Sequence, residues 1–461
     1  MIQAYHLPAL PGIATTVERF GKGDGAVELA LPLLTPELVA RQAEALRQER
    51  DALAARPARE LAALLGGVAE RFLSEGDALR EAALSALPAV AGYSPEMARL
   101  VLDGMAAQWR GERLLDLLGR EFGDAAVLDG FVRLGGRRVL AVAPALTVQL
   151  FAGNVPGVTV TALVRSLLVK SPVLGKAASG EPLLPALFAR ALAEQDAALG
   201  RALAVAWWRG GNQYLERAAL ERAEAVVAYG SNDSVGSLRR RAPPGARFIG
   251  YGHKFSFGVV ARERATSAAA RAAAIDVATF DQRGCVSPQL IYVEEGGAAS
   301  PREWAGLLAS ELTKLEPRLP RGPLSPGEAS ALRELRAETD FAGLSEGGAR
   351  LFEPARGTGW LVIFDPDPAP APSCLNRAVR VKPVSSLGEV PDLVARAAPL
   401  LQTVGVAAPE CRVEELAVRL AVFGASRVCP LGQMSWPPPE WHHDGLPPLR
   451  SLVRWCDWEY S

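Results

Sequence analysis

The sequence predicts an α/β protein built on doubly wound parallel sheets. Short apolar runs bounded by Gly or Pro begin near Phe131, and helix-like apolar patterns lie between them. Strand, helix and strand at this spacing indicate parallel strands joined by crossover helices. The length of 461 residues exceeds what one hydrophobic core normally serves, so we expect more than one domain.

The predicted elements fall into three groups along the chain. Apolar positions at helical spacing, with many Ala, Leu, Glu and Arg residues, predict an N-terminal helical region over residues 36–125. A first α/β group follows, and a second begins near Phe255. In the first group we expect strands at 138–142, 148–151, 173–175, 204–208 and 225–229, and helices at 158–169 and 182–199. In the second we expect strands at 257–260, 289–294 and 361–364, and helices at 265–274, 301–315 and 391–401.

Charge and composition exclude several classes of protein. Lys and Arg number 50 against 51 Asp and Glu, so no global positive field is available to gather nucleic acid or anionic lipid. The densest basic run, 239–241, is typical of a solvated helix end, with a cofactor phosphate as the alternative. No apolar run reaches the roughly 18 residues of a membrane span. We therefore expect a soluble protein with no nucleic-acid partner and no membrane span.

The cysteines and histidines indicate neither disulfides nor a metal site. Five cysteines, an odd number without a CxxC pair or a signal peptide, are typical of free thiols in a reducing cytoplasm. His442 and His443 are adjacent and cannot share a helix face, so we expect no metal. The glycine-rich residues 21–25 precede no clear strand-to-helix step, so they predict a loop rather than a dinucleotide fingerprint.

Three turns follow predicted strands, at the sheet edge where doubly wound proteins bind ligands. Asn154 could donate its side-chain amide to an oxyanion, although an Asx turn or a helix cap is the alternative. Lys176 ends the next strand, where it could reach a ribose or a phosphate. Residues 229–236 form a Gly-rich strand-to-helix turn that a pyrophosphate could approach closely.

Cys285 follows a glycine in a polar loop just before a predicted strand, which suits a nucleophile. A lone cysteine is more often a small core residue. Cys285 is favoured as a catalytic thiol only because it occurs together with the three turns described above.

The order of these features resembles the aldehyde dehydrogenase superfamily: an Asn-x-Pro turn, a strand ending in Lys, a Gly-Ser turn, a Gly-x-Lys turn and then the cysteine. More specifically, the chain from about Tyr93 onward resembles the fatty acyl-CoA reductases of the bioluminescence LuxC type. The sequences that carry this resemblance are 153–157, 251–254, 281–282 with 285–289, and 443–445.

The resemblance implies roles for the matching residues. Cys285 would be the nucleophile, and Asn154 with the Cys285 backbone N–H would stabilise the oxyanion. His253 could protonate a leaving group, with a structural hydrogen bond as the alternative. The implied cofactor contacts are Lys176, Ser179, Gly230, Ser231, Val235 and Gly236. The superfamily glutamate that holds the nicotinamide ribose has no counterpart in residues 374–379.

The implied fold is aldehyde-dehydrogenase-like, with a doubly wound NAD(P)-binding domain, an α/β catalytic domain and a small oligomerisation β element. We expect residues 1–252 to hold the helical region and the NAD(P)-binding domain, with an oligomerisation hairpin at 129–143. Residues 253–428 would form the catalytic domain, and 429–461 would return to the first domain and the oligomer interface. A C-terminal strand within 450–460 would pair with the hairpin of a neighbouring subunit, so we expect a homodimer or a larger homo-oligomer.

The predicted function is NADPH-dependent reduction of an acyl thioester, as a fatty acyl-CoA or on a carrier, to an aldehyde through a Cys285 acyl-enzyme. Gly250 stands where aldehyde dehydrogenases carry the glutamate that activates water, so the acyl-enzyme would await hydride. Ser179 stands where NAD-preferring relatives often carry Glu, which favours NADPH, although Glu181 lies nearby and NADH stays open. An NAD(P)-dependent aldehyde dehydrogenase and a non-redox acyl-transfer subunit are the alternatives.

Overall fold

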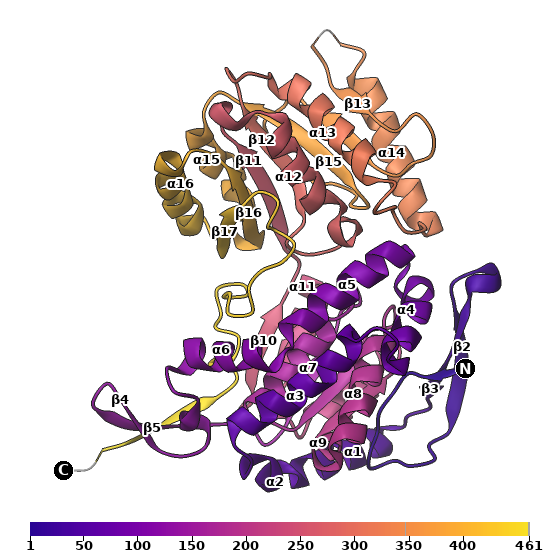
Figure 1. The fold of residues 1–461 in the computed structure, drawn as a ribbon, viewed down its shortest axis with the longest axis vertical. Helices are drawn as coiled ribbons and strands as arrows, with labels where there is room; N and C mark the ends of the chain where they lie inside the picture. Colours follow the sequence, from indigo (N-terminus) through magenta and orange to yellow (C-terminus); the bar gives the residue numbers. More distant parts are fainter. Residues whose placement is uncertain (346, 460–461) are drawn as a thin grey trace. The chain divides into compact units, whose positions relative to one another are not determined.

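A computed structural model describes residues 1–345 and 347–459 and divides into two compact units. Unit 1 comprises Met1–Ala91, Ala98–Gly252 and the chain from Pro439 onward. Unit 2 comprises Gly92–Met97 and His253–Pro438. Each unit carries its own parallel sheet, with helices on both faces (Figure 1).

Unit 1 is built on a five-stranded parallel sheet in the order β10-β9-β6-β7-β8. The chain moves from β6 in one direction through β7 and β8, then returns to the other side of β6 with β9 and β10. The carboxyl ends of β6 and β9 therefore flank the topological switch point, where such sheets bind ligands. The strands are β6 (Thr147–Leu150), β7 (Val173–Ala177), β8 (Leu203–Trp207), β9 (Ala225–Tyr229) and β10 (Arg247–Tyr251). The helices between them are α7 (Val158–Leu168), α8 (Leu183–Gln195), α9 (Ala197–Arg201), α10 (Gln213–Leu220) and α11 (Asn232–Arg241).

The predicted N-terminal helical region consists of six helices, and a small sheet that the sequence did not predict precedes it. The three-stranded sheet has the order β1-β3-β2, and the glycine-rich residues 21–25 turn the chain between β2 and β3. Its strands are β1 (Ile2–Gln3), β2 (Thr15–Phe20) and β3 (Val27–Pro32). The helices are α1 (Pro36–Gln48), α2 (Arg50–Ala54), α3 (Ala58–Leu73), α4 (Ala78–Ala91), α5 (Pro95–Gln108) and α6 (Gly111–Phe122).

Unit 2 has a seven-stranded sheet in the order β13-β14-β15-β12-β11-β16-β17, in which only β13 runs antiparallel. One face is covered by α12 and α13 around Trp304, and the other by α15 and α16 around Tyr292. The strands are β11 (Phe255–Val260), β12 (Pro288–Glu294), β13 (Arg350–Phe352), β14 (Leu361–Phe364), β15 (Ala378–Val384), β16 (Leu401–Ala407) and β17 (Arg427–Pro430). The helices are α12 (Ser267–Ala278), α13 (Pro301–Leu315), α14 (Pro326–Ala342), α15 (Val390–Val394) and α16 (Glu410–Val422).

The helix predicted at 391–401 is shorter than expected. α15 ends at Val394, a 3-10 segment covers Ala395–Leu400, and Leu401 already begins β16. Pro399 has no backbone N–H to donate, which prevents a regular α-helix from continuing.

A third, antiparallel sheet of three strands lies in unit 1, where β5 pairs with both β4 and β18. The strands are β4 (Val132–Leu134), β5 (Arg137–Val142) and β18 (Arg454–Trp458). The C-terminal strand was expected to pair with a neighbouring subunit's hairpin, and this was wrong: it pairs with the hairpin of its own chain. Leu449 and Val453 are buried just before β18, which directs the following residues along β5. Tyr460, at the end of the predicted strand, lies outside the described residues.

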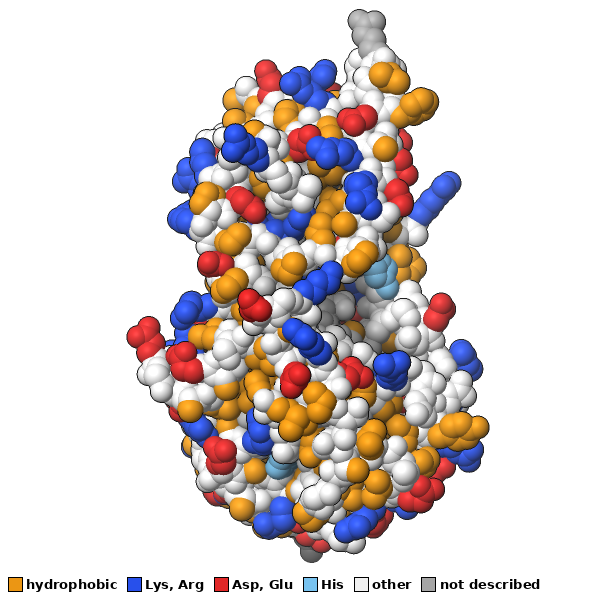
Figure 2. All heavy atoms as spheres, turned by 90° about the vertical axis from the view of Figure 1, so that its right-hand side faces the viewer, with side chains coloured by type: hydrophobic (Ala, Val, Ile, Leu, Met, Phe, Trp, Pro, Cys, Tyr) orange, Lys and Arg blue, Asp and Glu red, His pale blue; other side chains and the backbone are white. Residues whose placement is uncertain are grey.

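Charged side chains of both signs are interspersed over the face drawn in Figure 2, in keeping with the formal net charge of -1. Among the described residues, no helix is both long enough and apolar enough to cross a bilayer.

The packing of α3 on α6 gives a stability prediction. A Cβ at Gly66 would lie 2.4 Å from the Gly111 backbone nitrogen, whereas a Cβ at exposed Gly119 would meet nothing within 4 Å. We expect Gly66→Ala to lower the free energy of unfolding by about 1–3 kcal/mol through overpacking. The matched Gly119→Ala variant should raise it by about 0.5–1 kcal/mol, because alanine favours the helix. Urea unfolding measures both, and equal effects would contradict the described packing.

Candidate active site

Cys285 is exposed and lies in the loop before β12, at the edge of the unit 2 sheet where its parallel strands begin. The Ser256 hydroxyl donates to the Cys285 carbonyl oxygen at 2.7 Å and accepts from the Thr403 backbone N–H at 3.1 Å. A backbone hydrogen bond of 3.0 Å from Ser287 to Gly284 closes a turn around the cysteine. The loop is thus tied to β11 and β16, while the thiol-bearing residue faces solvent.

The three residues Phe280, Asp281 and Gln282, shortly before Cys285, form a left-handed turn. Their φ angles are 59°, 50° and 63°, a conformation that strains every residue except glycine. Such strain persists only where the surroundings enforce it, and it is concentrated at functional sites.

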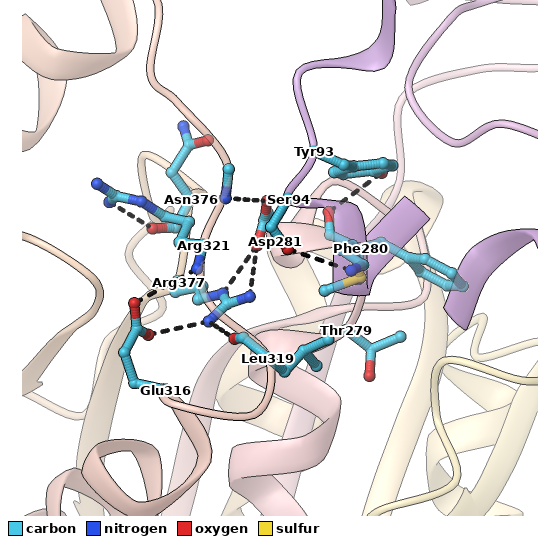
Figure 3. A network of polar contacts seen from close by, with 12 residues as sticks. Tyr93, Ser94, Thr279, Phe280, Asp281, Glu316, Leu319, Arg321, Asn376 and Arg377 are labelled. Carbon is cyan, nitrogen blue, oxygen red and sulfur yellow. Dashed lines mark hydrogen bonds and ion pairs between the residues drawn. The ribbon is translucent and has the colours of Figure 1, made fainter. Parts of the chain in front are cut away.

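A second left-handed turn, formed by Leu375, Asn376 and Arg377, precedes β15, and a buried ion pair joins it to the first (Figure 3). The Arg377 guanidinium lies 2.7 Å and 2.8 Å from one carboxylate oxygen of Asp281 through two of its nitrogens. The two side chains are 1% and 0% exposed. The other Asp281 oxygen accepts from the Gly322 backbone N–H at 3.1 Å.

Further contacts hold both turns in place. Arg377 also donates to the Glu316 carboxylate at 3.1 Å and to the Leu319 carbonyl at 2.8 Å (Figure 3). Gln282 donates its side-chain amide to the carbonyl oxygens of Pro288 and Ala378, at 2.7 and 2.8 Å, and so joins β12 to β15. We call the two left-handed turns, 280–282 and 375–377, together with the contacts that hold them, the frame. Cys285 follows this frame closely in the chain.

Three of the residues 374–379, in which the sequence offers no counterpart to the expected ribose-binding glutamate, belong to this frame. Asn376 and Arg377 are 3% and 1% exposed, so neither side chain presents a surface to a ribose. Sequence reasoning missed the frame, because nothing local indicates that Asp281 and Arg377 meet.

His253 is exposed and lies immediately before β11, at the same edge of the unit 2 sheet as the Cys285 loop. It lines an apolar cavity of about 620 Å³ together with Phe255 and Gln289.

In unit 1, exposed Asn154 lies in the turn between β6 and α7, beside the switch point. The N-cap of α7 is Gly157, with a φ of 89°, so the helix-cap interpretation of Asn154 is wrong. A Cβ at Gly153 would lie 2.9 Å from the Ala178 side chain, so this turn packs closely on the turn that follows β7.

Lys176 is the penultimate residue of β7 and is 6% exposed. Burial lowers the pKa of its ammonium group to about 8, although the Glu216 carboxylate opposes the shift. Ser179, three residues on, is exposed in the tight turn between Ala178 and Glu181.

Glu181 is 1% exposed, and its carboxylate accepts from the Leu184 backbone N–H at 2.7 Å at the start of α8. Burial raises the pKa of Glu181 to about 8, against the opposing effect of the Leu184 and Leu183 N–H groups. Glu181 is therefore part of the interior, and Ser179 is the exposed residue of this turn.

The third predicted turn lies at the carboxyl end of β9. The Gly230 N–H donates to the Tyr251 carbonyl at 3.1 Å, and exposed Ser231 caps α11 by accepting from the Ser234 N–H at 3.2 Å. The free N–H groups and the dipole at such a helix start favour phosphate oxygens. Gly236 lies one turn further into α11, whereas Val235 packs into the hydrophobic core of unit 1.

Position 250 has no room for a side chain. Gly250 lies in β10, and a Cβ there would lie 2.5 Å from a Val235 methyl carbon. A glutamate at this position would require the Val235 side chain to shift.

The basic run 239–241 forms the last turn of α11, at the opposite end of the helix from Ser231. Arg239 stacks on the Phe248 ring, and Arg241 pairs with Glu216 at 2.6 Å. Positive charge there suits the helix dipole, which favours the helix-end interpretation. Arg241 also lines a cavity of about 1040 Å³ with Arg209 and Arg217.

Sequence reasoning gave no role to the aromatic rings beside the turn that follows β9. Asp444 and Gly445 have φ angles of 51° and 81° and turn the chain so that His443 bridges to Leu446. The His443 ring stacks on Tyr251 at 4.1 Å, and Tyr251 stacks on Tyr229 at 4.8 Å. The sequence 443–445 therefore places aromatic faces at the carboxyl ends of β9 and β10.

No group of three or more His, Cys, Asp or Glu side chains among the described residues could hold a metal ion.

Comparison with known proteins gives one consistent result. The family model described as acyl-CoA reductase (LuxC) matches residues 53–455. The long-chain acyl-protein thioester reductase of Aliivibrio fischeri is 27% identical over 398 residues, covering 85% of this chain and 80% of that protein. Long-chain acyl-protein thioester reductase 2 of Photobacterium leiognathi is 26% identical over 396 residues, with the same coverage.

Solved structures confirm the predicted fold. An oxidoreductase from Marinobacter aquaeolei matches with a TM-score of 0.77 at 17% identity, covering 98% of this chain and 97% of that one. A benzaldehyde dehydrogenase from Corynebacterium glutamicum matches with a TM-score of 0.73 at 16% identity, covering 99% and 98%. The aldehyde-dehydrogenase-like fold and the resemblance to the LuxC type are both confirmed.

The buried ion pair gives a second stability prediction. Arg377→Leu leaves the Asp281 carboxylate buried and unpaired, which should lower the free energy of unfolding by about 3–5 kcal/mol. Adding Asp281→Asn should recover part of this loss, because the amide is neutral. Arg336→Leu, which breaks a half-exposed pair with Glu353, should cost less than about 1 kcal/mol. Similar losses for both arginines, measured by urea unfolding, would contradict the frame.

The buried carboxyl of Glu181 gives a pH prediction. Its pKa is raised from 4.5 to about 8, so between these values the folded chain holds a proton that the unfolded chain has released. Stability should therefore fall as pH rises through this window. We expect Glu181→Gln to remove that fall and to be more stable than the wild type by roughly 4 kcal/mol at pH 8, but little changed at pH 4.5. Glu414→Gln, at an exposed position, is the control. If the stability of Glu181→Gln fell with pH in parallel with that of the wild type, the raised pKa of Glu181 would be refuted.

Proposed function

Because the chain belongs to the acyl-CoA reductase (LuxC) family and so reduces acyl groups to aldehydes, we propose that it does so with NADPH through an acyl-enzyme on Cys285. The observation that carries the proposal is the exposed Cys285 on a loop fixed by Ser256 and by the strained turn before it. A nucleophile held on a rigid frame needs little reorganisation to attack.

In the proposed first step, the Cys285 thiolate attacks the thioester carbonyl carbon. The Asn154 amide and the Cys285 backbone N–H donate to the oxyanion as it forms. The carbon–sulfur bond to the donor then breaks, the donor leaves as a thiolate that takes up a proton, and the acyl group stays on Cys285. His253 is a candidate source of that proton.

The residues of unit 1 suit a nicotinamide dinucleotide at the switch point. Ser231 and the start of α11 suit a pyrophosphate, and Lys176 at the end of β7 suits a ribose or a phosphate. When bound, the cofactor supplies the hydride that reduces the acyl group. Cys285 then leaves as the thiolate, and the aldehyde is released.

The crowding at Gly250 supports reduction over hydrolysis. With Val235 occupying the space beside it, no carboxylate at position 250 can activate water. The Cys285 thioester would then persist until hydride arrives. This argues against the oxidative aldehyde dehydrogenase alternative, which needs that base.

The turn after β7 supports NADPH over NADH. Ser179 is its exposed residue, and the Glu181 carboxylate is directed into the interior, so neither opposes a 2′-phosphate. The related proteins named long-chain acyl-protein thioester reductases support a long acyl chain, delivered either on CoA or on a carrier protein.

The decisive experiment follows aldehyde formation and NADPH oxidation with purified protein and acyl-CoAs of several lengths. Cys285→Ser should abolish both, whereas Cys411→Ser, which removes another exposed thiol, should leave both unchanged. Without NADPH, intact-mass analysis should find one added acyl group, and Cys285→Ser should lack it. Acylation without any NADPH oxidation would instead indicate an acyl-transfer subunit.

A second variant tests the oxyanion donor. One such donor is typically worth about 3 kcal/mol, so Asn154→Ala should lower turnover roughly a hundredfold. Acylation of Cys285 should slow in proportion while binding of NADPH stays unchanged. A wild-type rate would remove Asn154 from the mechanism.

A further inference from the structure

The 620 Å³ cavity of unit 2 lies at the same sheet edge as Cys285. Phe255, in its lining, is the first residue of β11, and its neighbour Ser256 donates to the Cys285 carbonyl. Gln289, also in the lining, is the second residue of β12, the strand that follows the Cys285 loop. The lining therefore includes the chain neighbours of Ser256 and Pro288, which accept or donate hydrogen bonds at the two ends of the Cys285 loop, and not the loop itself. Its volume is within the range of about 300–1,000 Å³ typical of small-molecule sites.

The walls of this cavity are mainly apolar. The proline-rich loop 369–372 forms part of the lining, and α15 with the 3-10 segment after it contributes Leu393, Ala397 and Leu400. Phe255 belongs to the hydrophobic core between the sheet and α15, and its ring stacks on that of Phe257. Such a lining favours an alkyl chain over a sugar or a nucleotide.

The proline-rich wall is anchored at its start. The Tyr292 hydroxyl donates to the Pro368 carbonyl at 3.0 Å, and the Lys382 ammonium group donates to the Asp367 carbonyl at 2.6 Å. Pro370 and Pro372 then restrict the backbone of the wall itself. The cavity is thus largely formed before any ligand arrives, which lowers the entropy lost on binding.

Few charges reach the cavity, and they lie on its helical side. Asp392 is exposed and pairs with Arg419 at 3.3 Å, so its charge is partly balanced. Arg396 is exposed, and no ion pair to it is found within the described part of the chain. An aliphatic chain can therefore occupy the interior without desolvating a buried charge.

We propose that this cavity receives the alkyl chain of the acyl group that Cys285 carries, and so determines the chain length of the substrate. The inference rests on the proposed function, and it adds the residues that select the substrate. Each methylene placed in the cavity should tighten binding about fourfold until the cavity is full.

The test narrows the cavity and compares acyl lengths. Ala397→Phe fills it from the helical side, and Ala395→Phe is the matched control, because Ala395 is equally half-buried in the same 3-10 segment but does not line the cavity. With Ala397→Phe, kcat/KM for a 14-carbon acyl-CoA should fall at least tenfold, and that for a 4-carbon acyl-CoA less than twofold. Ala395→Phe should preserve the wild-type ratio.

Two outcomes would overturn the inference. Equal losses for long and short chains, or none, would show that the alkyl chain lies elsewhere. If Ala397→Phe impaired every CoA thioester but no N-acetylcysteamine thioester, the cavity would hold the pantetheine arm of the donor.

A binding measurement separates this inference from the proposed function. Displacement of a fluorescent fatty acid by free fatty acids of increasing length needs neither NADPH nor turnover, and can be run on Cys285→Ser. A length dependence that Ala397→Phe removes and Ala395→Phe keeps supports the cavity, even if no aldehyde is ever formed. Aldehyde formation with an unaltered length profile would instead retain the function and reject the cavity.

Discussion

The ion pair between Asp281 and Arg377 is the interaction on which the reactive part of unit 2 depends. Two almost fully buried charges are tolerated only when they are paired and hydrogen-bonded, and both conditions are met here. Each partner also belongs to a strained left-handed turn of three residues. Neither turn would be stable alone, and each provides the charge that holds the other. The loop of Cys285 is connected to this arrangement by two residues of chain.

One partner of the same pair lies in residues 374–379, the segment in which the sequence offers no counterpart to the expected ribose-binding glutamate. Arg377 of this segment is 1% exposed and is directed into the interior. The cofactor contacts proposed for this chain accordingly all belong to unit 1, at the ends of β7 and β9.

Much of the fold was predictable, because the central strands of both sheets are continuous apolar runs. Two of the strands that were not predicted, β15 and β2, break that pattern for physical reasons. β15 carries Arg380 and Lys382, whose charges are balanced by Asp365 just after β14, so its sequence does not look buried. The N-terminal strand β2 alternates between half-buried and exposed residues around a sheet of only three strands, which gives a weak signal.

The candidate site was predictable as separate turns but not as a frame. Local sequence placed Asn154, Lys176, Ser231 and Cys285 at strand ends, because Gly, Asn and Pro mark such turns. It could not show that Val235 belongs to the core, since a valine in the first turns of a helix fits either role. Tertiary structure imposes the left-handed conformation of the non-glycine residues and the ion pair between distant segments. No local sequence pattern predicts either feature.

The pairing of β18 with β5 has a consequence for how the chain is completed. During synthesis, the whole of residues 253–438 emerges between the two strands that must pair. Unit 2 has its full sequence before unit 1 does, and β5 keeps an unpaired edge until the last strand arrives. An open edge of this kind invites pairing with other chains. A chain cut short before Arg454 would therefore still possess its thiol and its buried ion pair. It would, however, expose the unpaired edge of β5 to association with other chains.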